Sequence, residues 1–575
     1  MASQLLLCVW VSFTMILYTS CQSFQTVHTP SGPIKGLVVP TLGKDIVQFR
    51  NIPYAKPPIG NLRFEKPLPI EPWTEILDGT VFGPSCMQDK SFLSAIGENT
   101  DHAMSEDCLY LNVYVPGDVS TNANKAVMVW IHGGGLVLFN GWGYDASFLT
   151  MKDIIVVTIN YRLGIFGFLS TGDLTMPSNF GLWDMIEALK WVNKNIASFG
   201  GDPDSVTIFG ESAGGIAVSF LGIIPNTAGL FKRMIAQSGS AIAYYCVTRD
   251  PVKFAKSIGK LVGCVAGKDS DIDNHVLRDC LKRKTADELL QAQSNPGTRT
   301  QHFGTFSLLP TIWPVIDGEL IQRPPLDILN DPNSEESIYF RSLDLLAGTT
   351  DNEGVLMPMF LAGFQESMKF NMTEGIPTPV LCDVVAPTLA KEMFNDNSVA
   401  SDLICKEYSS DSLEQQSRNI VNLFADSWFV FPTMHLLEFH AKDKLSPNTY
   451  QYVYTQAVNF WFWIPTYPWM EGAGHAVELL YMFGPTGFSE RDPSLSTDEG
   501  RAFTDVLVTY WTNFAKSGNP NGDGLVPWKA FSLSSRDYLE LKYQPSPGQN
   551  LFEKRMKFLS QDISNKIQSA AKTEL

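Results

Sequence analysis

Gly210-Glu211-Ser212-Ala213-Gly214 is the stretch of this 575-residue chain that decides the fold. It follows an apolar run, 206–209, that is typical of a β-strand, and it precedes residues 215–220, which can begin a helix. A strand, the pattern Gly-x-Ser-x-Gly and a helix form the layout of a nucleophile elbow, a turn that leaves the serine hydroxyl alone at the tip of a sheet. The pentapeptide by itself could also be an ordinary glycine and serine turn, so the hypothesis depends on further segments.

A second glycine-rich segment lies upstream of the elbow. The apolar run 127–131 leads directly into His132 and the triplet Gly133, Gly134 and Gly135. A serine hydrolase needs backbone N–H donors aimed at the oxyanion that forms on the substrate carbonyl, and glycine lets the backbone approach closely. A strand followed by His-Gly-Gly-Gly is the usual second half of such an oxyanion hole, and the elbow supplies the N–H of Ala213. A simple tight turn is the alternative.

An acid is expected downstream of the serine, because the chain order in this architecture is serine, acid, histidine. Residues 343–348 are predicted to form a buried strand that leads into the polar loop 349–354. Asp351 and Glu353 both lie in this loop, just past the strand end, where a carboxylate is well placed to hold an imidazole. The spacing leaves the choice between them open.

Three histidines follow that loop and are candidates for the base. His435 and His440 lie in an apolar, helix-like stretch and are expected to be structural or surface residues. His475 lies in a glycine-containing loop, 472–476, before an apolar run. Loops between rigid elements are where catalytic groups tend to lie, so this context favours His475.

These four segments together resemble the type-B carboxylesterase and cholinesterase family of α/β-hydrolases, and most of all its liver-type carboxylesterases. The run 105–112, Ser-Glu-Asp-Cys-Leu-Tyr-Leu-Asn, is similar to a second signature of that family. The likeness extends from about Gly32 to Trp528. The resemblance implies that Glu353, and not Asp351, is the acid. It assigns the catalytic triad to Ser212, Glu353 and His475, and the oxyanion hole to Gly134, Gly135 and Ala213.

The expected architecture is an α/β-hydrolase fold, a mainly parallel central sheet flanked by helices, with long insertions. Strands and helices alternate along the chain, which indicates a sheet covered on both faces. Residues 180–199 have the apolar spacing of an amphipathic helix, and Asp202-Pro203-Asp204 is expected to end it before the elbow strand. No linker, repeat or low-complexity tract divides the chain, so residues 22–575 are predicted to form a single catalytic domain.

Both ends of the chain carry targeting patterns. Residues 1–21 are predicted to be a signal peptide, with a signal anchor as the alternative, because the apolar run 5–18 is short for a membrane span. No later segment is expected to span a bilayer, so no transmembrane anchor is predicted. The last residues resemble a KDEL-type retrieval signal, which predicts the endoplasmic reticulum lumen and a retrieval receptor as partner, with secretion as the alternative; they are Lys572, Thr573, Glu574 and Leu575.

Entry into the secretory pathway permits disulfides. The family resemblance pairs Cys86 with Cys108 and Cys264 with Cys280. Proximity along the chain suggests the pair Cys382 and Cys405, which leaves Cys246 as a buried thiol. The sequon Asn-Met-Thr at Asn371 is a candidate glycosylation site.

The predicted activity is hydrolysis of carboxylic esters through an acyl-enzyme, with broad specificity for uncharged esters that are xenobiotic or lipid-derived. No cofactor and no metal are expected, because this chemistry needs neither. A net charge of −17 disfavours nucleic acid and anionic membranes as partners, although solubility explains it as well. The alternatives are a lipase, a bile-salt-stimulated type of lipid esterase, and a non-catalytic adhesion or binding protein on the same fold.

The substrate is less well defined by the sequence. Cholinesterases of this family bind the quaternary ammonium with a tryptophan in the first disulfide loop, whereas the loop 86–108 contains none and has Glu98 near that position. Choline esters are therefore disfavoured. Five aromatic residues are candidates for the lining of an ester pocket, with packing in the core or on the surface as the alternative: Phe139, Trp142, Trp461, Trp463 and Trp469.

Overall fold

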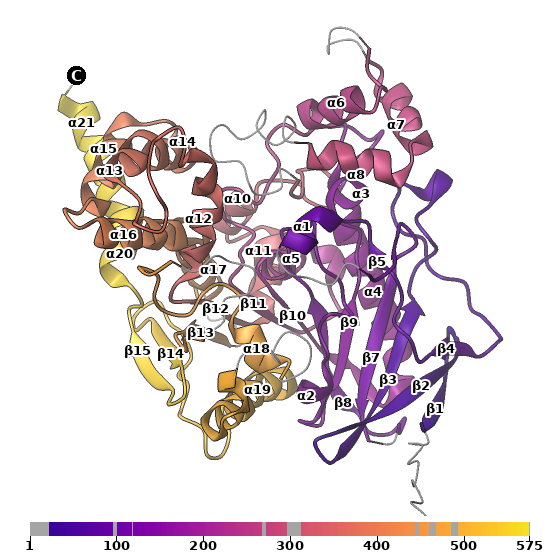
Figure 1. Ribbon diagram of the computed structural model, residues 1–575. Coiled ribbons are helices and arrows are strands. Elements are labelled where there is room, and N and C mark those ends of the chain that lie inside the picture. Colours follow the sequence, from indigo (N-terminus) through magenta and orange to yellow (C-terminus); the bar gives the residue numbers. More distant parts are fainter. Residues whose placement is uncertain are drawn as a thin grey trace, which may run out of the picture.

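A mixed β-sheet runs through the computed structural model of the protein (Figure 1). The structure describes residues 22–95, 101–117, 119–266, 272–295, 312–442, 448–458, 467–484 and 493–573. Within these residues the sheet has 13 strands in the order β1-β2-β3-β7-β9-β8-β10-β11-β12-β13-β14-β15, with β4 beside β2. Their bounds are β1 Phe24–Thr29, β2 Gly32–Thr41, β3 Lys44–Pro53, β4 Leu77–Gly79, β7 Tyr110–Pro116, β8 Lys125–Ile131, β9 Ile155–Ile159, β10 Gly201–Glu211, β11 Arg233–Gln237, β12 Asp344–Thr350, β13 Thr449–Tyr454, β14 Asp537–Leu541 and β15 Ser546–Gln549.

The centre of the sheet is parallel and its edges are antiparallel. In the order in which the strands lie in the sheet, the pairings β9–β8, β8–β10, β10–β11, β11–β12, β12–β13 and β13–β14 are all parallel. The pairings β1–β2, β2–β3, β3–β7, β7–β9 and β14–β15 are antiparallel. Short turns join β1 to β2, β2 to β3 and β14 to β15, and strands joined by a short turn pair in antiparallel fashion. The pairs β3–β7 and β7–β9 are joined by longer segments. The expectation of a mainly parallel central sheet is thus confirmed, and the antiparallel pairs lie towards its edges.

Helices cover both faces of the parallel centre. Along β8, Val127, Val129 and Ile131 pack into one core with helices α4 and α5, whereas Met128 and Trp130 pack into a second core with α18 and α19. This alternation follows from the two-residue period of a strand buried on both sides. The helices of these layers are α2 Ser147–Thr150, α3 Gly164–Phe168, α4 Phe180–Asn195, α5 Ala213–Gly222, α6 Pro251–Leu261, α7 Asn274–Arg283, α8 Ala286–Ser294, α18 Glu478–Met482 and α19 Asp498–Ser517.

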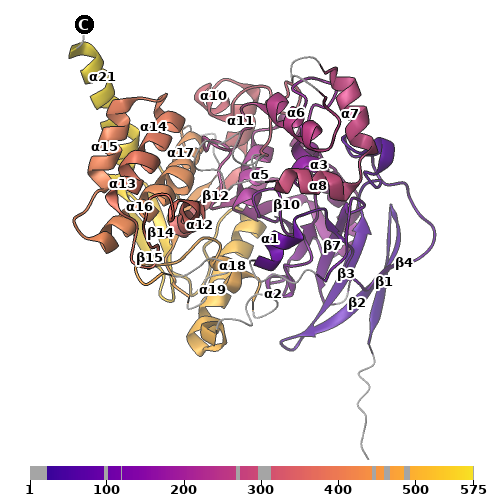
Figure 2. The ribbon, with the colours of Figure 1, turned by 45° about the horizontal axis from the view of Figure 1, so that its top comes forward.

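A third apolar core lies in a group of helices beyond the β12–β15 end of the sheet, away from β1 to β4 (Figure 2). The helices in this part of the molecule are α12 Met357–Leu361, α13 Thr378–Val380, α14 Ala386–Phe394, α15 Ser398–Tyr408, α16 Leu413–Ala425, α17 Phe431–His440, α20 Glu553–Lys557 and α21 Ile563–Thr573. Helices α10 Pro325–Asn330 and α11 Glu335–Ser342 pack into the core that contains α4 and α5. A π-helical turn, Asp426–Val430, joins α16 to α17.

The continuous helical run Leu413–His440 corrects one expectation. By length and apolar composition it is long enough to cross a membrane, yet 83% of its most apolar window is buried inside the protein. A helix that is apolar on most sides is expected wherever it lies in the middle of a core. Its composition therefore reflects burial in the helical group and gives no sign of an anchor.

The boundary before the elbow strand also differs from the expectation. Helix α4 continues as a 3₁₀ turn, Ile196–Phe199, and Gly200 at φ 86° ends it. Strand β10 already begins at Gly201, so Asp202-Pro203-Asp204 lies within the strand, where its register with β8 shifts. Proline is tolerated at such an irregularity because no ladder hydrogen bond is needed there.

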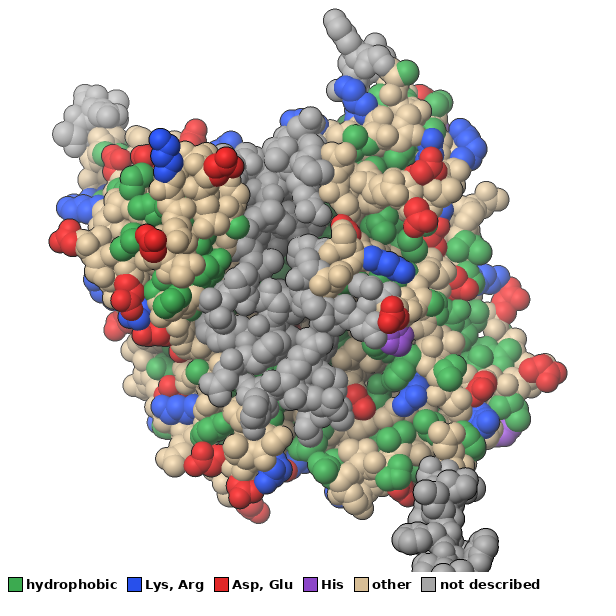
Figure 3. Space-filling model, viewed as in Figure 1, with side chains coloured by type: hydrophobic (Ala, Val, Ile, Leu, Met, Phe, Trp, Pro, Cys, Tyr) green, Lys and Arg blue, Asp and Glu red, His purple; other side chains and the backbone are tan. Residues whose placement is uncertain are grey.

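Three disulfides join Cys86 to Cys108, Cys264 to Cys280 and Cys382 to Cys405. Cys246 is a buried free thiol. Some of the predicted features lie outside the described residues. They are the signal peptide at residues 1–21, the side chains of Glu98, Trp461 and Trp463, and the last two residues of the retrieval signal. Acidic and basic side chains are interspersed on the described surface of the face in Figure 3, as solubility requires.

Candidate active site

Ser212 lies on a sharp turn between β10 and α5. Its backbone has φ 58° and ψ −124°, a conformation that costs a non-glycine residue about 1–3 kcal/mol. Its N–H donates to the carbonyl of Gln237 at 2.8 Å, and its carbonyl accepts from the N–H of Ile216 at 2.9 Å. The strand and the helix on either side therefore hold the turn in place, and Ser212 lies at the helix N-terminus, where negative charge is favoured.

The glycines around Ser212 are required by backbone crowding. A Cβ atom on Gly210 would lie 2.5 Å from the carbonyl oxygen of Ile131, and one on Gly214 would lie 2.1 Å from the same atom. Neither distance is possible for a real side chain, because the interior is already close-packed. The end of β8 thus presses against the elbow, which explains why both positions lack a side chain.

The glycine loop after β8 lies directly against the elbow. A Cβ atom on Gly133 would lie 3.2 Å from the Cβ of Ser212. Gly134 and Gly135 have φ values of 95° and 62°, which glycine adopts readily. Among the described residues, no acceptor is bound by the N–H groups of Gly134, Gly135 and Ala213. The loop and the elbow therefore bring three unused backbone donors to the neighbourhood of Ser212.

His132 fixes the start of this loop. Burial lowers the pKa of His132 to about 4, so the ring is neutral at physiological pH. Its Nδ1 lies 2.9 Å from the carbonyl oxygen of Gly133, and Tyr161 donates from its hydroxyl to the carbonyl of His132 at 2.7 Å. The two rings stack with centroids 4.4 Å apart. The loop geometry is thus supported by the side chains of His132, just after β8, and Tyr161, just after β9.

His475 and Glu353 form a buried pair on the other side of the elbow. Nδ1 of His475 lies 2.5 Å from Oε2 of Glu353, although 122 residues separate them in the chain. The other oxygen of Glu353 accepts hydrogen bonds from the hydroxyl of Ser238 and, at 2.7 Å, from the N–H of Thr350. Glu353 is fully buried, and these donors hold its carboxylate in one orientation.

The structure places Asp351 against the histidine loop and away from the imidazole. Its Oδ1 accepts from the N–H of Ala473 at 2.7 Å, and the N–H of Asn352 donates to the carbonyl of Ala473 at 3.1 Å. Burial raises the pKa of Asp351 to about 6. Asp351 therefore binds the backbone of the loop that carries His475, while Glu353 binds its side chain.

The other two histidines are remote from the elbow. His440 is buried and lies 2.8 Å from the hydroxyl of Thr449 and 2.8 Å from the carbonyl of Leu343. Burial lowers its pKa to about 4. His435 lies on α17 beside Glu438, 3.9 Å away. Both histidines are structural, as expected from their apolar helix.

Comparison with known proteins gives the family. The model of the carboxylesterase family matches residues 23–559. The chain belongs to the carboxylesterase family. It is 34% identical to the rat pyrethroid hydrolase Ces2e (Rattus norvegicus) over 96% of this chain and 91% of that protein. It is also 34% identical to the human cocaine esterase (Homo sapiens) over 96% of this chain and 94% of that protein.

A third relative is the medium-chain fatty acyl-CoA hydrolase precursor of the duck Anas platyrhynchos, 34% identical over 93% of this chain and 92% of that protein. The mixed sheet with helices on both faces is the α/β-hydrolase fold of the family. This member of the carboxylesterase family is accordingly a serine carboxylesterase, a hydrolase of carboxylic esters.

Two further glutamates of this carboxylesterase lie at the site and were not singled out from the sequence. Oε1 of Glu211 lies 3.1 Å from Nε2 of His475, and Glu478 accepts from the side-chain amide of Gln237 at 3.1 Å. Burial raises the pKa of Glu211 well above its usual range and that of Glu478 to about 7. Glu211 is part of the elbow pentapeptide, and Glu478 is a lone carboxylate in an apolar run, which are the two signals that point to them.

The protonation of His475 reflects these neighbours. Burial lowers the pKa of His475, but the carboxylates of Glu211 and Glu353 outweigh burial and raise it to about 9. Gln237 connects Glu478 to the apolar core: its side-chain nitrogen donates to Glu478, and its side-chain oxygen accepts from the indole N–H of Trp511 at 3.1 Å. The imidazole is thus surrounded by more negative charge than a single acid partner would supply.

The aromatic residues suggested for an ester pocket divide into two groups. Trp469 is buried, donates to the carbonyl of Met372 at 2.9 Å and stacks on Tyr467, so it belongs to the third core. Phe139 and Trp142 are half-buried and follow the glycine loop. Phe139 lies against Gly134, whereas Trp142 donates to the hydroxyl of Ser85 at 2.9 Å.

Proposed function

We propose that this carboxylesterase cleaves uncharged esters through an acyl-enzyme on Ser212. His475 takes the proton of the serine hydroxyl as its oxygen attacks the ester carbonyl carbon, and Glu353 holds the imidazole and stabilises the imidazolium. His475 then donates that proton to the leaving alcohol. Water attacks the acyl-enzyme with the same histidine as base and releases the carboxylic acid.

One observation carries this proposal: the buried pair of His475 and Glu353, 2.5 Å apart, presents its second ring nitrogen to the elbow. That nitrogen lies 3.1 Å from the carboxylate of Glu211, the residue immediately before Ser212. A base that is held by an acid and lies beside the residue that precedes a strained serine supports an activated nucleophile at Ser212.

The oxyanion is proposed to bind the N–H groups of Gly134, Gly135 and Ala213. Supporting this, the glycine loop lies against Ser212, and none of the three groups has an acceptor among the described residues. A donor fixed before the reaction stabilises the developing charge without reorganisation, and each is worth about 100–1,000-fold in kcat.

The substrate class is inferred from composition and relatives. The relatives are named for pyrethroid, cocaine and fatty acyl-CoA hydrolysis, which supports a broad range of xenobiotic or lipid-derived esters. The loop 86–108 has no tryptophan with which to bind a quaternary ammonium. A lipid esterase of the lipase type remains the second candidate, favoured by the acyl-CoA hydrolase relative.

Residues 22–575 are proposed to act as one catalytic domain in the endoplasmic reticulum lumen. The signal-like segment 1–21 and the KDEL-like ending support entry and retrieval. Asn371, whose side chain is exposed, is the proposed glycosylation site. Secretion is the alternative, and a version of the chain without its last four residues, expressed in cultured cells, distinguishes the two by whether it moves to the medium.

The proposed function is tested with a short-chain p-nitrophenyl ester, the wild-type enzyme and Ser212→Ala. Removal of such a nucleophile lowers kcat about a million-fold. Ser219→Ala is the matched control, because Ser219 is a buried serine on α5, the helix that follows Ser212, and its hydroxyl accepts from the N–H of Ala241 at 3.0 Å. Hydrolysis that survives in Ser212→Ala would overturn Ser212 as the nucleophile. A folded wild type that cleaves no ester would overturn the proposal and favour a binding protein.

A further inference from the structure

The first disulfide loop and the glycine loop are joined by one glutamine. Gln88, two residues after Cys86, is buried, and its side-chain oxygen accepts from the N–H of Phe139 at 2.7 Å. Its side-chain nitrogen donates to the carbonyl of the same Phe139 at 3.0 Å. The amide thus satisfies both backbone groups of one residue, as a neighbouring strand would.

Phe139 needs this support, because its backbone is in the left-handed region at φ 75°. It closes a turn in which the N–H groups of Val137 and Leu138 both donate to the carbonyl of Gly134 at 3.0 Å. A bulky residue holds such a conformation only where the surroundings impose it. Gln88 imposes it from outside the turn.

The turn is in direct contact with the oxyanion glycines. A Cβ atom on Gly134 would lie 2.5 Å from the carbonyl oxygen of Leu138 and 2.7 Å from the ring of Phe139. A shift of Phe139 by a few tenths of an ångström therefore moves the peptide groups on either side of Gly134. Because the interior is close-packed, there is no free space that could accommodate the shift without moving these peptide groups.

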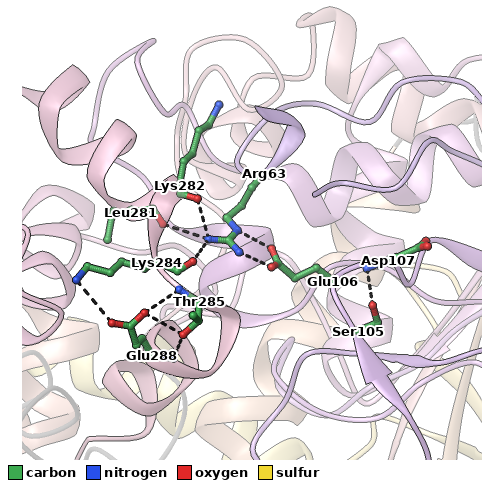
Figure 4. Close-up of polar contacts among 9 residues, drawn as sticks. All are labelled: Arg63, Ser105, Glu106, Asp107, Leu281, Lys282, Lys284, Thr285 and Glu288. Atoms are coloured by element: carbon green, nitrogen blue, oxygen red, sulfur yellow. Dashed lines mark hydrogen bonds and ion pairs between the residues drawn. The ribbon is translucent and has the colours of Figure 1, made fainter. Parts of the chain in front are cut away.

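The base from which Gln88 reaches is itself rigid. The amide of Gln88 also donates to the carbonyl of Cys86 at 3.1 Å, and Cys86 is bound to Cys108. Near the other end of this loop, Glu106 forms a two-point ion pair with Arg63, whose guanidinium also donates to three carbonyls at the end of α7 (Figure 4): those of Leu281, Lys282 and Lys284. The loop is thus tied to two other parts of the chain before it contacts the glycine loop.

We propose that Gln88 is a positioning residue for the oxyanion hole: its side-chain amide binds both backbone groups of Phe139 and thereby sets the direction of the N–H groups of Gly134 and Gly135. This role rests on the proposed function of those two glycines. Gln88 touches neither substrate nor nucleophile. Its effect is on the stabilisation of the transition state and leaves ground-state binding of the ester unchanged.

The test replaces Gln88 by methionine, which has the same length and no hydrogen-bonding amide. The chain offers a matched control in Asn521, whose amide binds both backbone groups of Trp528 with the same geometry, at 2.7 and 2.9 Å. Asn521→Leu removes an equivalent two-point contact from a loop after α19. Both variants are compared with wild type in kcat, KM and thermal unfolding.

Gln88→Met is expected to lower kcat about 10- to 100-fold, less than the loss of a whole donor, with KM changed less than about threefold. Its affinity for an aryl trifluoromethyl ketone, whose hemiketal oxyanion occupies the hole, falls in the same proportion as kcat. Its affinity for the matching methyl ketone, which binds without forming an oxyanion, stays at the wild-type value. Asn521→Leu is expected to lower the Tm while it keeps kcat and both affinities.

Gln88→Glu sharpens the result, because glutamate keeps the acceptor for the N–H of Phe139 and loses the donor, so an intermediate kcat is expected. Wild-type kcat and ketone affinity in a folded Gln88→Met would overturn the proposal, as would an equal loss of kcat in Asn521→Leu. If Gln88→Met does not fold, Gln88→Glu decides by the same comparison. Ser212→Ala in the same assay shows separately whether the proposed function itself fails.

Discussion

The two sides of the candidate active site are built by different means. The nucleophile side, made of the glycine loop and the elbow, consists of backbone: glycines, positive φ angles and N–H groups within segments of a few residues. The acid–base side consists of two side chains, Glu353 just after β12 and His475 in its loop, which are 122 residues apart and meet through buried charges. We therefore expect the nucleophile side to be sensitive to added side-chain volume and the acid–base side to be sensitive to a change of charge.

The largest effect that tests this difference is expected on the acid–base side. Glu353→Gln keeps the size of the side chain and removes its charge, and a comparable change in other triads lowers kcat about 10,000-fold. Asp351→Asn is the matched control, because Asp351 binds the backbone N–H of Ala473 and an amide oxygen still accepts from it. Steady-state kinetics on one ester compares the two. Equal losses would mean that the two acids are not distinct.

On the nucleophile side, Gly214→Ala is expected to act through volume alone. The added methyl group would lie 2.1 Å from the carbonyl of Ile131, so unfolding free energy should fall by about 3 kcal/mol, the upper range for overpacking. Gly363→Ala is the control, since nothing lies within 4 Å of a Cβ there. Urea unfolding measures both. A Gly214→Ala variant as stable as Gly363→Ala would contradict the crowding argument.

The charge side should also be visible in the pH profile. Glu211 and Glu353 raise the pKa of His475 to about 9, so the acidic limb of kcat/KM is expected above the pKa of a free imidazole. Glu211→Gln removes one of these charges and should shift the limb to lower pH. A limb that stays in place or moves to higher pH would show that Glu211 does not act on the base.

A smaller effect is expected further from the reaction, at Asp426. Burial raises the pKa of Asp426 to about 6 from its usual 3.8, although Arg555, 3.2 Å away, opposes this. A raised pKa contributes stability at low pH that is lost as the pH rises toward 6. The Asp426→Asn variant has no ionisable group at this position. The difference in Tm, variant minus wild type, should therefore increase as the pH rises from 4 to 7. A constant difference would contradict the raised pKa.

The sequence predicted the nucleophile side because its residue patterns are local. The glycines at 210 and 214 and the triplet 133–135 form short patterns that are visible in the chain, although the contacts that crowd Gly210, Gly214 and Gly133 come from the neighbouring segment. The acid could not be chosen in this way, since Asp351 and Glu353 lie two residues apart in one loop. Only the family resemblance favoured Glu353, and the structure shows that the two acids bind different parts of the histidine loop.

Other features could not be read because they depend on distant packing. Glu478 and Gln237 lie in apolar runs, and their pairing across 241 residues has no sequence pattern. The alternation of strands and helices indicates a mainly parallel sheet but does not locate the antiparallel pairs towards its edges. No later apolar segment of membrane-spanning length was predicted, whereas residues 413–440 form one continuous helical run with a largely buried apolar window.

That helix has a consequence for the chain before it folds. Every segment that enters the secretory pathway is exposed to the bilayer at the translocon, where an aspartate at the centre of an apolar helix disfavours insertion by about 3 kcal/mol. Asp426 lies near the middle of Leu413–His440, in the π-helical turn. On the proposed route into the endoplasmic reticulum, the carboxylate that is costly to bury in the folded protein would therefore help this long apolar segment to pass through to the aqueous side.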